Sequence, residues 1–108
     1  MLQVVLNGEC AYEYVPQSRL PGHQRQFLDQ MDSDMDSGIR LAGEEIAAPG
    51  ETQRVQYVAM QLLRAIDNDN ATLRAACSAW LCYRQPALRA IVADEQGGVV
   101  HMQLIQDD

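Results

Sequence analysis

The sequence predicts an α+β domain in which about three helices pack on a small antiparallel sheet, formed by an N-terminal strand and a C-terminal hairpin. Two observations lead to this class. Short apolar, β-branched runs lie near both ends, at residues 2–6 and 99–105, and each adjoins an Asn-Gly or Gly-Gly turn signal. Between them, three longer segments repeat apolar residues with the period of a helix. A length of 108 residues suits a single globular domain, residues 1–108.

The N-terminal segment is expected to form a strand and a tight turn. Residues 2–6, LQVVL, are apolar and β-branched, and Asn7 and Gly8 follow directly. Residues 9–15 alternate loosely between polar and apolar side chains, so they are expected to pair back on the first strand. The prolines within residues 16–21 then interrupt regular structure.

The first helix is predicted over residues 22–37. Leu28, Met31 and Met35 recur at i, i+3 and i+7, so they form one apolar stripe along this helix. Gly38 suits the left-handed residue that commonly ends a helix.

Two further helices are predicted after a loop. Residues 38–50 carry three glycines and a proline, which predicts a loop with one helical turn around residues 44–47. Helical periodicity then covers residues 51–67 and 71–84, and Pro86 is expected to stop the last helix. The connector between these helices is short and polar, so they are expected to form an antiparallel hairpin.

The C-terminal segment is predicted to be a β-hairpin. Glycines 97–98 lie between two apolar runs, and a two-residue turn there would pair Ala93 with Met102 and Ile91 with Leu104. This register places apolar side chains on one face, so the apolar pattern agrees with the turn.

An alternative reading makes residues 87–95 a fourth helix. Pro86 would open this helix, with Leu88 and Ile91 on one side and Gly97 after its end. The strand is favoured because the facing run, residues 99–105, has a clear β pattern.

Charge and composition restrict the function classes. The net charge is −7, and the eight basic residues are all arginines that stand singly along the chain. Sequence-independent nucleic-acid binding needs clustered Lys and Arg, so no nucleic-acid partner is expected. No apolar run reaches the length of a membrane span, and no secretory signal is evident. Three cysteines without framework spacing suit a reducing compartment, which predicts a cytoplasmic protein. No cofactor is expected.

Four aspartates lie within residues 29–36 and resemble the start of a calcium-binding loop. Such a loop needs glycine at its sixth position and glutamate at its twelfth. Counted from Asp32, these positions hold Ser37 and Gly43, so the pattern fails. The methionines keep a helical period through the segment, which therefore predicts the last turns of an amphipathic helix.

On that helix, Asp29, Asp32 and Asp36 are expected to share the face opposite the apolar stripe. The simplest interpretation is a solvated acidic face. The other two are a docking face for a basic partner and a weak site for a divalent ion such as Mg²⁺. Acids in the last turn of a helix oppose its dipole, at about 0.3–1 kcal/mol each. Chance or codon drift can produce this placement, and so can a use for the charge.

Two smaller groups are candidate sites. Arg19, His23 and Arg25 lie at or just before the start of the first helix, where backbone N–H groups can bind an anion. An ordinary helix start is the favoured interpretation of these residues. His101 is expected opposite Asp94 on the sheet, as a surface contact or half of an acid–base pair. Cys77 is expected in the core.

No catalytic motif stands out, and the favoured hypothesis is a small protein-interaction module without catalytic activity, working as a homodimer with protein partners. An alternative is a Mg²⁺- or Mn²⁺-dependent enzyme that acts on a phosphorylated or nucleotide substrate. Asp29, Asp32 and Asp36 would then hold the ion, with Arg25 or Arg40 on the substrate. A third hypothesis is an acidic mimic of nucleic acid, although these aspartates make only one short row.

Overall fold

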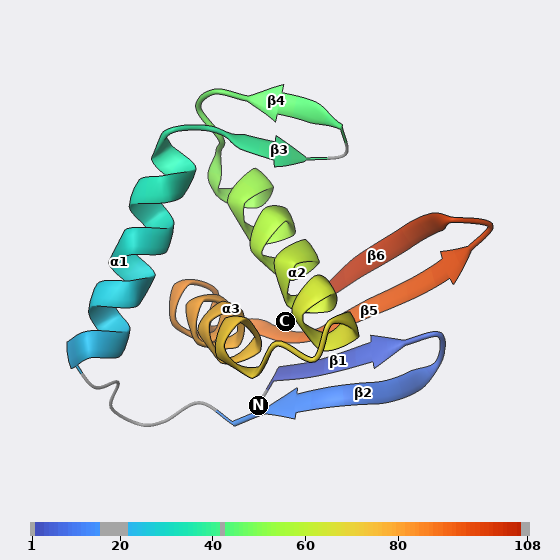
Figure 1. The fold of residues 1–108 in the computed structure, drawn as a ribbon. Coiled ribbons are helices and arrows are strands. Elements are labelled where there is room, and N and C mark those ends of the chain that lie inside the picture. The colour runs from blue at the N-terminus through green and yellow to red at the C-terminus, as the bar shows by residue number, and fades with distance from the viewer. Residues whose placement is uncertain (1, 16–21, 42, 107–108) are drawn as a thin grey trace.

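A computed structural model describes residues 2–15, 22–41 and 43–106 and confirms the α+β class (Figure 1). The three predicted helices are present and pack with a sheet that contains the N-terminal and C-terminal strands. In chain order the elements are β1 (Leu2–Leu6), β2 (Glu9–Tyr14), α1 (Gly22–Asp36), β3 (Ile39–Leu41), β4 (Glu44–Ile46), α2 (Glu51–Asp67), α3 (Ala71–Arg84), β5 (Leu88–Gln96) and β6 (Val99–Gln106).

The main sheet is mixed, which corrects the prediction of an antiparallel sheet. Its strand order is β2-β1-β5-β6, with β1 and β5 parallel and the two outer pairs antiparallel. A parallel pair needs a long crossover connection, and the chain from β2 through α1, α2 and α3 provides one. The direction of β5 therefore depends on the path of the helices, which the strand sequences do not encode.

The C-terminal hairpin has the predicted register. Ile91 pairs with Leu104 and Ala93 with Met102, so residues 88–96 are strand and not a fourth helix. Gly97 and Gly98 have φ values of +59° and +81°, and a two-residue hairpin turn of this kind requires positive φ at both positions.

The segment after α1 forms a second, small hairpin, so the predicted helical turn around residues 44–47 is wrong. Ile39 pairs with Ile46 across β3 and β4, and Ile39 is buried. Gly38 has φ +110°, and a Cβ atom there would lie 3.2 Å from the carbonyl oxygen of Ile46. This hairpin lies at one end of α2, while the other end of α2 reaches the main sheet (Figure 1).

One apolar core joins the helices to one face of the main sheet. The predicted stripe on α1 is present, since Leu28 and Met35 are buried and Met31 is half-buried. Trp80 and Cys77 of α3 belong to the same core, as do alternate residues of the two central strands: Leu2, Val4, Ile91 and Ala93.

The ends of α2 and α3 agree with the sequence signals. The Asn70 side chain accepts a 3.1 Å hydrogen bond from the backbone N–H of Leu73, which caps α3. The short polar connector between α2 and α3 lets the two helices pack together. Within the described ranges, no helix has the length and apolar character that a membrane span requires.

Candidate functional site

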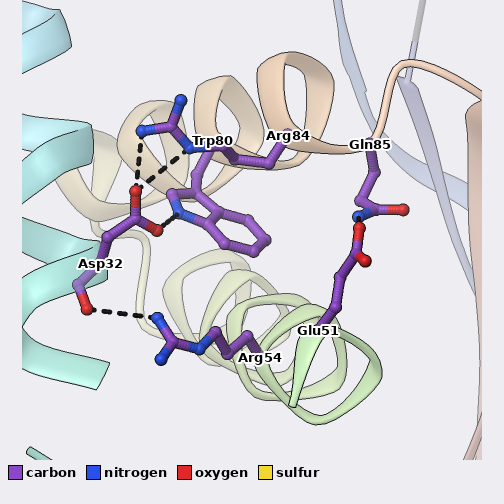
Figure 2. A pocket seen from close by; sticks show the side chains of 6 residues that line it. All are labelled: Asp32, Glu51, Arg54, Trp80, Arg84 and Gln85. Carbon is purple, nitrogen blue, oxygen red and sulfur yellow. Dashed lines mark hydrogen bonds and ion pairs between the residues drawn. The ribbon is translucent and has the colours of Figure 1, made fainter. Parts of the chain in front are cut away.

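Asp32 of α1 occupies the junction between α1 and α3 (Figure 2). Its Oδ1 atom accepts a 2.8 Å hydrogen bond from the indole N–H of Trp80. Its Oδ2 atom accepts hydrogen bonds from Arg84, at 3.1 Å from Nε and 2.7 Å from Nη2. Only 31% of the Asp32 side chain is exposed, and Trp80 is 3% exposed. Asp32 therefore satisfies a polar group that α3 buries in the core.

Asp29 and Asp36 extend this cluster toward solvent. Arg84 Nη2 also lies 3.2 Å from Asp29 Oδ1, and Arg54 of α2 forms an ion pair with Asp36. The Asp29 and Asp36 side chains are 75% and 66% exposed, as expected for a solvated face. The expectation that all three carboxylates face solvent is wrong for Asp32, because Trp80 and Arg84 cover it.

Arg54 fixes α2 to the C-terminal half of α1. Besides its ion pair with Asp36, it donates to the backbone oxygen of Asp32 at 3.4 Å and to that of Pro49 at 3.2 Å. Arg54 and Arg84 thus place positive charge beside the acidic last turns of α1. These contacts offset the unfavourable interaction of the acids with the helix dipole.

A pocket of about 320 Å³ opens between α1, α2 and α3. It is lined by Asp32, Glu51, Arg54, Trp80, Arg84 and Gln85 (Figure 2). Its charged walls already pair with one another or with α1, and Gln85 donates a 2.7 Å hydrogen bond to Glu51. A ligand entering this pocket must therefore compete with existing hydrogen bonds. Among the described residues, no three His, Cys, Asp or Glu side chains converge in a way that could hold a metal ion.

The candidate anion site falls mostly outside what the structure describes. Arg19 lies outside the described residues, and His23 lies in α1 but its side chain is outside the description. Arg25 is exposed on α1. His101 and Asp94 do lie opposite each other in the β5–β6 pairing, and both are exposed.

The cysteine thiols lack the features of nucleophiles. Burial raises the pKa of Cys77 to about 12, and burial also raises the pKa of Cys82. Desolvation, followed by a hydrogen bond to Glu13, raises the pKa of Cys10. All three are free thiols, and a raised pKa keeps each protonated at neutral pH. The prediction that Cys77 is a core residue is confirmed.

A second concave surface, the helix groove, lies between α1, α2 and α3. Its volume is about 230 Å³, and its lining includes Phe27, Met31, Asp34, Tyr57, Gln61 and Leu73. Phe27 is 46% exposed, so a large aromatic side chain lies partly in water beside the buried Leu28 of α1. Asp34 is the one carboxylate among the described residues of the lining, and none of those residues is basic.

Sequence reasoning missed the helix groove because its walls come from three helices. Phe27, directly beside the apolar stripe, was the one available signal.

The outer edge of β6 is a third exposed surface. β6 is the last strand of the main sheet, and its neighbour in the described chain is β5. Val100 and Ile105 of β6 are each 43% exposed.

Comparison of the chain with protein-family models, with curated proteins and with solved structures finds no match.

Proposed function

We propose that this chain is a small protein-interaction module that acts as a homodimer in the cytoplasm and has no catalytic activity of its own. The observation that carries this proposal is the helix groove, a mainly apolar surface that includes the partly exposed side chain of Phe27 and the carboxylate of Asp34. The free thiols suit a reducing compartment.

The size of the helix groove favours a protein partner over a small metabolite. Its volume of about 230 Å³ lies below the range of roughly 300–1,000 Å³ typical of small-molecule sites. A groove of this size is suited to one or two anchoring side chains of a larger partner. Met31 in its wall is flexible and polarisable, which allows such a surface to adapt to different apolar anchors.

The charge around the helix groove favours a basic partner. Asp34 accepts a 2.9 Å hydrogen bond from Gln30, which leaves carboxylate lone pairs available. The chain carries a net charge of −7, which attracts a basic partner at long range, whereas Asp29 and Asp36 lie outside the groove lining and pair with arginines. The partner that fits is an amphipathic helix with apolar anchors on one face and Lys or Arg beside them.

Calorimetric titration with a designed peptide tests this proposal. The probe is an amphipathic helix of Leu and Lys in helical period, and its control has every Lys replaced by Glu. The basic peptide is expected to bind and the acidic peptide is not. Phe27→Ala is expected to weaken binding at least tenfold, whereas Ile105→Ala, which removes an equally exposed apolar side chain elsewhere, leaves it unchanged. If Phe27→Ala binds the basic peptide as tightly as the wild-type protein does, the proposal is contradicted.

A further inference from the structure

The free edge of β6 lacks the protection that sheet edges normally have. β6 is outermost in the sheet, so backbone N–H and C=O groups along one side of it have no strand beside them in the described chain. Exposed edges are usually protected by charges, prolines or bulges. Residues 99–106 contain no Asp, Glu, Lys, Arg or Pro, and the hairpin's register shift falls on β5, between Leu88 and Ala90.

The opposite edge of the same sheet is protected. β2 carries Glu9 and Glu13, and its pairing with β1 contains a register shift between Val4 and Val5. Acidic side chains and an irregular strand both discourage pairing with another chain. The two edges therefore differ, and β6 is the one suited to accept a strand.

We infer that two copies of the chain pair antiparallel through β6, so that their sheets become one continuous sheet across a two-fold axis. This inference rests on the homodimer in the proposed function and names its surface. Two copies of a chain with a net charge of −7 repel each other over most of their surfaces. His101 is the one ionisable side chain of β6, so the strands can meet without placing like carboxylates opposite each other.

The apolar pattern of β6 selects the register of this pairing. Residues directly opposite in an antiparallel pair project to the same face. The two-fold axis between the strands must therefore lie level with one residue, which is then opposite its own copy. With the axis at Met102, Val100 lies opposite Leu104 of the partner subunit and Met102 lies opposite itself. All these side chains share the face of Ile91, where the helices pack.

An axis at Gln103 gives a poorer match. It would place Val100 opposite Gln106 of the partner subunit and Ile105 opposite the partner subunit's His101. Val100 and Ile105 are the exposed large apolar side chains among the described residues of β6, and each would then face a polar side chain. The Met102-centred register covers Val100 with an apolar neighbour, so it is the one proposed.

Sedimentation equilibrium tests whether the chain dimerises through β6. The wild-type chain is expected to be a dimer, and Val100→Lys is expected to weaken self-association at least tenfold because the two lysines enter an apolar contact. Val100 is 43% exposed, so the monomer fold tolerates this change, and circular dichroism checks that it does. The control is Ala11→Lys, an exposed site on β2, which should remain a dimer.

Two results distinguish the β6 dimer from peptide binding at the helix groove. A wild-type monomer at every concentration overturns the inference and the homodimer but leaves peptide binding at the helix groove unaffected. A dimer that survives Val100→Lys overturns the β6 surface alone.

Disulfide trapping tests the register independently. In a Cys10→Ser background, Met102→Cys is expected to form a covalent dimer on mild oxidation, since opposite Cβ atoms lie about 4.5–5.5 Å apart. In the same register two copies of Ile105→Cys lie about 20 Å apart and should not link. Efficient linking by Gln103→Cys or Ile105→Cys, without linking by Met102→Cys, overturns the Met102-centred pairing.

Discussion

The indole N–H of Trp80 donates a 2.8 Å hydrogen bond to Asp32, which joins α3 to α1 across 48 positions of the chain. Trp80 is 3% exposed, so its N–H group has little access to water and depends on this acceptor. Arg84 binds the other oxygen of the same carboxylate. Asp32 is therefore part of the support of the fold, and the acidic row on α1 is only partly available to a partner.

Asp32→Ala is expected to destabilise the protein by roughly 1–3 kcal/mol, because it leaves the buried Trp80 N–H without an acceptor. Asp32→Asn keeps an oxygen for Trp80 but turns an NH2 group toward Arg84, so it loses the Arg84 hydrogen bonds and ion pair. Arg84 is 39% exposed and can turn to water, so the cost of Asp32→Asn should be smaller. Urea unfolding followed by Trp80 fluorescence measures both. The control is Asp34→Ala, an exposed site on the same helix, and an equal loss there would argue against the role given to Asp32.

Mg²⁺ and Mn²⁺ are expected not to bind at Asp29, Asp32 and Asp36. Asp29 and Asp32 already share Arg84, and Asp36 pairs with Arg54, so a metal ion would have to displace two guanidinium groups. Calorimetric titration with millimolar metal should therefore give no binding heat. A binding isotherm that disappears in Asp32→Asn would revive the metal-dependent enzyme hypothesis.

Gly38→Ala should cost more stability than Gly43→Ala. Both glycines have positive φ values, +110° and +82°, so both substitutions strain the backbone. At Gly38 the new Cβ atom would also lie 3.2 Å from the Ile46 carbonyl oxygen, whereas at Gly43 it meets open space. Urea midpoints of the two variants give the comparison, and equal midpoints would show that the β3–β4 hairpin does not approach α1 this closely.

Alkaline pH should remove the stability that Cys77 provides. Its pKa rises from 9.0 in the unfolded chain to about 12 in the fold, because burial disfavours the thiolate. The contribution is complete below pH 9 and is lost as pH rises toward about 12, since the unfolded chain then releases the proton first. The difference in unfolding free energy between wild type and Cys77→Ala should therefore narrow between about pH 9 and 11. A constant difference would contradict a buried, protonated thiol.

The sequence predicted the fold where two local signals agreed. The β5–β6 register followed from the Gly97-Gly98 turn and from the apolar match of Ile91 with Leu104. The parallel alignment of β1 with β5 depends on how three helices return the chain, which no local pattern records. The β3–β4 hairpin has three-residue strands, too short to show alternation, and the burial of Ile39 reflects tertiary packing.

The candidate site was predicted less completely than the fold. Helical spacing placed Asp29 and Asp36 on an exposed face, but it could not show that Trp80 and Arg84 would cover Asp32. One signal was available, because the single buried Trp needs an acceptor for its N–H. The helix groove needs three helices in place, so its lining could not be assembled from one segment.

A ¹⁵N–¹H NMR titration of the wild-type protein with the Leu/Lys amphipathic peptide tests binding at the helix groove residue by residue. Amide shifts are expected to concentrate around four residues that line the helix groove: Phe27, Met31, Tyr57 and Leu73. The Leu/Glu peptide should leave these amides unchanged. An absence of shifts with the basic peptide, or shifts that lie away from the helix groove, would contradict the proposal that this protein is an interaction module that binds through that surface.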